Sequence, residues 1–62
     1  MPIIQIEMTK GKSVEKKRAL AKNITDAVVA TLNCPKEVVT IIMREMEHED
    51  FAKAGVLKID DK

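Results

Sequence analysis

One long amphipathic stretch, residues 14–32, constrains the fold of this chain more than any other feature. Its apolar residues recur every four positions: Leu20, Ile24, Val28 and Leu32. This spacing places them on one face of an α-helix of about five turns. Ser13 is suited to cap the start of the helix, and Asn33 can adopt the left-handed conformation that ends one. We therefore expect a single helix over residues 14–32.

The stretches on either side of this helix have the patterning of β-strands. Apolar side chains alternate along residues 2–8, on one face: Pro2, Ile4, Ile6 and Met8. Residues 38–46 are rich in β-branched side chains and apolar on both faces, which is typical of a strand covered on both sides. The order strand, helix, strand predicts a β-α-β unit with parallel strands. The expected fold class is α/β (α+β).

The rest of the chain predicts connections and one small element. Residues 9–13 are expected to form a loop, and the polar residues 47–50 a turn. Residues 51–57 predict a short hairpin or an arm that packs on a neighbouring subunit, with Gly55 at the bend. The last residues, 60–62, are expected to be frayed.

The small size of the chain predicts that it assembles with copies of itself. Its 62 residues make one domain, residues 1–62, and a chain of this length buries only about 60% of its unfolded surface. The single cysteine, Cys34, and single histidine, His48, form neither an intrachain disulfide nor a closed zinc site. Two strands and one helix also leave a sheet face and two edges uncovered. We therefore expect strands to pair between subunits of a homo-oligomer.

Charge and hydropathy exclude several classes of partner. Lysine and arginine number 11 against 10 acidic residues, and the signs are interspersed, so no basic face for nucleic acid stands out. No apolar run approaches the roughly 20 residues that span a bilayer. The N-terminus lacks a cationic region followed by an apolar one. We expect a cytoplasmic protein that binds neither nucleic acid nor membrane.

Pro2 is the first candidate for chemistry. Met1 is normally removed when a small residue follows it, which would leave Pro2 with a free secondary amine. A strand directly behind Pro2 would hold this amine in place, and burial among apolar side chains would lower its pKa toward that of a general base. The alternative is structural, because proline is also ordinary at the first residue of a strand.

Several short motifs, taken in order, resemble the 4-oxalocrotonate tautomerase family over nearly the whole chain. They are Pro2, Ile4-Gln5-Ile6, Gly11-Lys12-Ser13 before a long helix, Pro35 before a strand, Glu45-Met46, and Phe51. The resemblance implies subunits that dimerise into a four-stranded sheet and assemble as a hexamer, a trimer of dimers. It also implies a tautomerase of the kind found in aromatic compound catabolism, which needs no cofactor and binds no metal.

The resemblance also implies roles for three residues. Pro2 would act as general base and then as general acid, moving a proton on a 2-hydroxydienoate or α-keto acid substrate. Lys12 stands at the family's usual arginine position, where a cation would bind a substrate carboxylate. Phe51 matches the aromatic wall, which would exclude water from the site.

Thr40 departs from the pattern, because characterised tautomerases commonly have a second arginine there. A neutral hydroxyl at Thr40 would bind a substrate weakly. Arg44 lies on the same strand face but four residues away, about 13 Å at roughly 3.3 Å per residue. Arg44 could therefore replace the missing cation only in a site of another subunit, and it too is a weak candidate for binding the substrate. The sequence thus predicts that a monocarboxylate is preferred to a dicarboxylate.

Two alternatives to a tautomerase remain open. The first is a noncatalytic oligomeric interaction protein on the same scaffold, which the loss of a cation at Thr40 would suit. The second is a hydratase or dehalogenase of unsaturated acids, which would need a further group to activate water. If Met1 were retained, the Pro2 nitrogen would be an amide, which is not a base.

Overall fold

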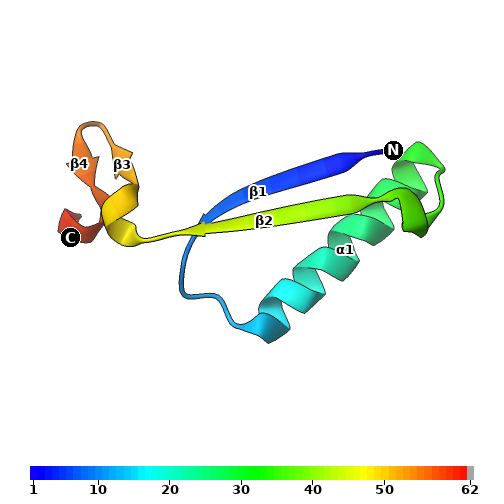
Figure 1. Cartoon of the computed structure of the whole chain (residues 1–62), viewed down its shortest axis with the longest axis horizontal. Helices are drawn as coiled ribbons and strands as arrows, with labels where there is room; N and C mark the ends of the chain where they lie inside the picture. The colour runs from blue at the N-terminus through cyan, green and yellow to red at the C-terminus, as the bar shows by residue number, and fades with distance from the viewer. Residues whose placement is uncertain (62) are drawn as a thin grey trace.

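The computed structural model describes residues 1–61 as a β-α-β unit followed by a short hairpin (Figure 1). The strands and the helix are β1 (Ile3–Thr9), α1 (Val14–Leu32), β2 (Thr40–Met46), β3 (Ala52–Lys53) and β4 (Val56–Leu57). Three short 3₁₀ turns connect or follow them: Lys36–Val38, His48–Asp50 and Lys58–Asp60. The predicted fold class, a β-α-β unit with a C-terminal hairpin, is confirmed.

The two long strands lie side by side and run parallel. Their register pairs Ile3 with Thr40 at one end and Thr9 with Met46 at the other. One further hydrogen bond extends the pairing at the first end, from the Thr40 amide to the Pro2 carbonyl at 3.0 Å. α1 is the crossover that parallel strands require.

α1 begins and ends at the predicted residues, and its caps explain why. The Ser13 hydroxyl accepts a hydrogen bond from the Lys16 amide at 3.2 Å. At the other end Asn33 adopts the left-handed conformation, with φ 56°, and its amide donates to the Val29 carbonyl at 3.0 Å. Both caps satisfy backbone groups that a helix terminus leaves unpaired.

The helix covers one face of the sheet. Side chains of alternating strand residues are half-buried on this face: Ile4, Ile6 and Met8 of β1, and Ile41 and Met43 of β2. Glu45 follows in the same alternation and pairs with Lys17 of α1 at 2.7 Å. The predicted alternation of the first strand is thus confirmed, and its apolar side packs under the helix.

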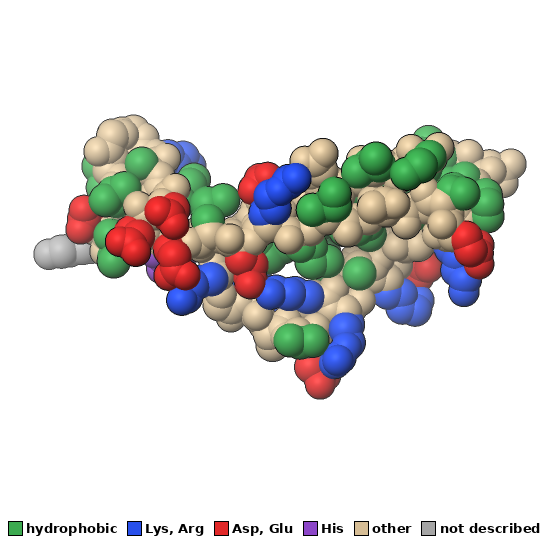
Figure 2. Space-filling view, viewed as in Figure 1, with side chains coloured by type: hydrophobic (Ala, Val, Ile, Leu, Met, Phe, Trp, Pro, Cys, Tyr) green, Lys and Arg blue, Asp and Glu red, His purple; other side chains and the backbone are tan. Residues whose placement is uncertain are grey.

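The opposite face of the sheet is open in a single subunit. Ile3 and Ile42 are 53% and 37% exposed there, and Figure 2 shows hydrophobic side chains gathered along the two strands. Arg44 crosses this face, and its Nη1 donates to Gln5 Oε1 at 2.8 Å and to Glu7 Oε2 at 3.1 Å. No residue within 1–61 is fully buried in the isolated subunit. Within this single subunit β2 is covered on one side only, and the expected cover of its other side by further copies stays a prediction.

The second strand begins two residues later than predicted. Pro35 is followed by a 3₁₀ turn, Lys36–Val38, in which the Val38 amide donates to the Pro35 carbonyl at 3.2 Å. The β-branched Val38 therefore belongs to the turn, and extended pairing starts at Thr40. The first strand likewise covers Ile3–Thr9 rather than residues 2–8, since Thr9 still pairs with β2.

The C-terminal segment forms the predicted hairpin. β3 and β4 pair antiparallel, and the bend is made by Ala54 and Gly55, with φ of 54° and 80°. The prediction that Asp60 is frayed was wrong, because it closes the 3₁₀ turn Lys58–Asp60, where the Asp61 amide donates to the Lys58 carbonyl at 3.1 Å. Lys62, also expected to be frayed, lies outside the described residues.

The molecule is elongated, with extents of 43, 24 and 14 Å. The hairpin lies beyond one end of the sheet, and the N-terminus lies at the other end (Figure 1). Within the described residues, no helix has the length and hydropathy needed to cross a membrane.

Candidate active site

Pro2 is held at the N-terminal end of the sheet. It is half-buried and directly precedes β1, and its carbonyl accepts the hydrogen bond from the Thr40 amide. Proline fixes its own φ, and the hydrogen bond from the neighbouring strand fixes its carbonyl. Met1, the residue before it, is 87% exposed. The ring nitrogen is therefore anchored by the strand rather than by a flexible side chain.

Thr40 lies beside Pro2 in the same subunit, whereas Arg44 does not. Thr40 opens β2 and is exposed on the open face, opposite Ile3. Arg44 lies four residues further along β2 and is engaged with Gln5 and Glu7. Its charge is thus already compensated by a carboxylate within the sheet.

Lys12 and Phe51 lie at the other end of the subunit. Lys12 is in the exposed loop before α1, and its Nζ donates to the Thr9 carbonyl at 3.0 Å and to Thr9 Oγ1 at 3.3 Å. Phe51, 38% exposed, stands between the His48–Asp50 turn and β3. It lines a small hollow with residues that end the two strands, among them Thr9 and Met46.

One subunit therefore does not bring the predicted site residues together. β1 separates Pro2 from the loop of Lys12 by seven residues. From Pro2 to Lys10 this is about 26 Å at roughly 3.3 Å per residue. Within one subunit neither the Lys12 ammonium nor the Phe51 ring can contact a substrate that is bound at Pro2.

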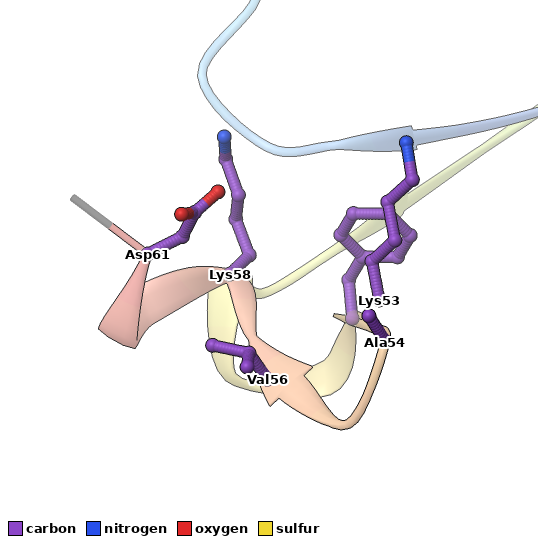
Figure 3. Close-up of a pocket in the computed structure, with 6 residues that line it drawn as sticks. Lys53, Ala54, Val56, Lys58 and Asp61 are labelled. Carbon is purple, nitrogen blue, oxygen red and sulfur yellow. The ribbon is translucent and has the colours of Figure 1, made fainter.

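The end that holds Phe51 also carries two lysines that the sequence analysis did not include. Lys53 and Lys58 line a hollow of about 470 Å³ together with Phe51, Ala54, Val56 and Asp61 (Figure 3). Lys58 also lines a second hollow that contains Lys12. The signal for Lys53 was present in the sequence, because residues two apart in an extended strand share a side. Nothing in the sequence indicated Lys58.

The tautomerase enzyme family model matches residues 2–60 of the chain. The chain belongs to the tautomerase family. A probable tautomerase of Listeria innocua is 38% identical over 60 residues, which cover 97% of this chain and 98% of that protein. Membership in the tautomerase family supports an isomerase activity in general, and it confirms the resemblance drawn from the sequence.

Solved tautomerase structures share the whole fold. A 4-oxalocrotonate tautomerase isozyme from Methylibium petroleiphilum is 40% identical with a TM-score of 0.91, over 94% of this chain and 91% of that one. A heterohexamer 4-oxalocrotonate tautomerase from Chloroflexus aurantiacus has a TM-score of 0.94 at 26% identity, over 100% of both chains. That tautomerase is an oligomer of six subunits.

Proposed function

We propose that this tautomerase family member is a cofactor-independent isomerase in which the Pro2 amine transfers the proton. The observation that carries the proposal is the position of Pro2, directly ahead of β1 in a chain whose family match starts at residue 2. Removal of Met1 would expose a secondary amine there. The amine would remove a proton from an enol, or from the carbon next to the ketone of an α-keto acid. It would then return that proton to another atom of the conjugated system.

The positions of Lys12 and Phe51 support a site shared between subunits. They lie at the far end of the sheet from Pro2, so the site would form where that end of one subunit meets Pro2 of another. The Lys12 ammonium would bind a substrate carboxylate and stabilise the enolate oxygen that develops during proton transfer. The Phe51 ring would exclude water and disfavour the protonated form of the amine.

The open sheet face supports the same assembly. Ile3 and Ile42 lie exposed on it, and none of residues 1–61 is fully buried in the isolated subunit. Such a subunit gains stability by covering this face. We propose a homo-oligomer, with a hexamer built as a trimer of dimers as the expected state. Thr40 and Arg44, the weaker candidates for substrate contacts, also lie on this face. Thr40 lies beside Pro2 of its own subunit, whereas Arg44 would act only across a subunit boundary.

The chemical test compares an amine with an amide at the same proline. The processed protein, verified by intact mass, is assayed for ketonisation of 2-hydroxymuconate beside a form that retains Met1. We expect the retained methionine to lower the rate about a hundredfold, the scale of a general base. Equal rates for the two forms would remove Pro2 from the mechanism.

The shared site is tested by mixing two inactive variants. Pro2→Ala and Lys12→Ala subunits are unfolded, combined in equal amounts and refolded together. If each site takes Pro2 and Lys12 from different subunits, about a quarter of the sites pair two intact residues, and activity returns. If both residues came from one subunit, every site would still carry a substitution and the mixture would stay inactive.

A further inference from the structure

Lys53 and Lys58 reach the same side of the C-terminal hairpin. In Figure 3 both side chains extend from the hairpin in the same direction, while Val56 points elsewhere. Lys53 is the last residue of β3 and stands opposite Val56 of β4. Lys58 directly follows β4, and its amide donates to the Phe51 carbonyl at 2.7 Å. This hydrogen bond holds the backbone of Lys58 beside that of Phe51.

The charges around this hollow favour an anion. Two ammonium groups line it against one carboxylate, Asp61. Neither lysine forms an ion pair with another residue of the described chain. Lys58 also borders the hollow of Lys12, so Lys12, Lys58 and Lys53 form a series of cations along this end of the subunit. We call Lys53 and Lys58 the hairpin lysines.

We propose that the hairpin lysines bind a second carboxylate of the substrate. The inference rests on the proposed function, since it assigns them to the site that Lys12 and Phe51 would complete. A planar conjugated diacid that lies against the Phe51 ring would place one carboxylate at Lys12 and the other at the hairpin lysines. Ammonium groups form charge-assisted hydrogen bonds with carboxylates and also balance their negative charge, whereas the Thr40 hydroxyl carries no charge.

This assignment reverses the substrate preference expected from the sequence. A missing cation at Thr40 predicts that a monocarboxylate is preferred, provided that no other cation reaches the site. The hairpin lysines supply that cation from another element. The dicarboxylate becomes the preferred class, and the preference resides in Lys53 and Lys58.

The kinetic test uses Lys53→Met and Lys58→Met, which remove the charge and keep a long side chain. We expect kcat/KM for 2-hydroxymuconate to fall about tenfold in each variant, the scale of a hydrogen bond to a charged group. With a monocarboxylate analogue we expect a change below about twofold, because only a second carboxylate uses these lysines. Lys53→Arg retains the charge and is expected to retain the preference.

The matched control is Lys22→Met, which removes the same charge from the outer surface of α1, where Lys22 is 75% exposed. We expect it to leave both substrates unchanged. Equal losses for the two substrates in the hairpin variants, or no loss in either, would overturn the proposal. A loss of the same size in Lys22→Met would also overturn it, because a general change in surface charge would then explain the effect.

A binding experiment separates this inference from the proposed function. Fumarate and crotonate, an unreactive diacid and monoacid, are titrated into the full-length Pro2→Ala variant at fixed ionic strength while backbone amide shifts are followed by NMR. We expect saturable shifts over residues 51–58 with fumarate, weakened about tenfold by Lys53→Met or Lys58→Met. Equal responses to fumarate, crotonate and sulfate, or none, would refute the inference even if Pro2 proved catalytic. Fumarate-specific shifts would support it even if catalysis at Pro2 failed.

Discussion

Replacing Ile42 by aspartate is expected to dissociate the oligomer. Ile42 lies on the open face of the sheet, opposite Gln5 and two residues along β2 from Thr40, which pairs with Ile3. The two isoleucines are therefore diagonal neighbours on one apolar patch. A charge at position 42 would have to be buried if another subunit covered this patch.

The size of the effect follows from the exposed fractions. The exposed fractions of Ile42 and Ile3 are 37% and 53%, which add up to about nine-tenths of the surface of one isoleucine. Complete burial of an isoleucine is worth about 1.5–3 kcal/mol, so covering both gives about 2 kcal/mol per subunit. Two subunits in a symmetric contact gain about 4 kcal/mol, which is about a thousandfold in the dissociation constant. Ile42→Asp loses the Ile42 share of this gain and adds the cost of an unpaired buried charge.

Sedimentation equilibrium measures the outcome directly. We expect the unmodified chain to sediment as an oligomer, and Ile42→Asp to sediment as a smaller species at the same concentration. The control is Val14→Asp, which replaces another exposed apolar residue, 59% exposed, at the start of α1, where a negative charge is favourable. If Ile42→Asp sediments like the unmodified chain, the open face is not an interface and the reasoning fails.

Three further predictions concern α1. Ser13→Ala removes the hydrogen bond from the Lys16 amide and is expected to lower the free energy of unfolding by about 1 kcal/mol in urea denaturation. An unchanged free energy of unfolding would mean that this cap does not stabilise the protein. Asn33→Ala places an alanine at φ 56° and is expected to lower the free energy of unfolding by about 1–2 kcal/mol in the same assay. Asn33→Gly is expected to avoid this loss, because glycine adopts a positive φ without strain; equal losses in the two variants would contradict a conformational cause. A hydrogen bond and then charge attraction from Asp26 raise the pKa of Lys22 above its ordinary value of 10.5. The stability that this pair supplies is therefore complete below the ordinary pKa and is lost as the pH rises through the raised one. Asp26→Asn is expected to lower the pKa of Lys22 in an NMR titration, and an unchanged value would refute the assignment.

The helix was predictable from the sequence to its end residues because local chemistry sets both ends. Ser13 and Asn33 cap the helix through hydrogen bonds and backbone conformations that involve only neighbouring residues. The start of β2 was not predictable in the same way. Val38 has the side chain of a strand residue, yet Pro35 favours a turn, and only the pairing of Thr40 with Ile3 decides where the strand begins. Strand propensity is set by such tertiary context more than by the residue itself.

The site was predictable in its residue types but not in its arrangement. That Pro2 lies far from Lys12 follows from the strand between them. The approach of Lys58 to Phe51 instead depends on the hairpin and on the two 3₁₀ turns that flank it, and their geometry has no strong sequence signal. The position of one subunit against another depends on exposed apolar residues such as Ile42. The sequence pattern shows that these residues are apolar, but it does not indicate which surface of another subunit would cover them.

The most direct test of the central claim is the rate of 2-hydroxymuconate ketonisation by the processed protein and by Pro2→Ala, measured side by side. Both proteins are first shown by sedimentation to have the same assembly state. We expect the substitution to lower kcat by about a hundredfold or more, the scale of a lost general base. Equal rates in the two proteins would make Pro2 a strand-start residue and would contradict the proposal.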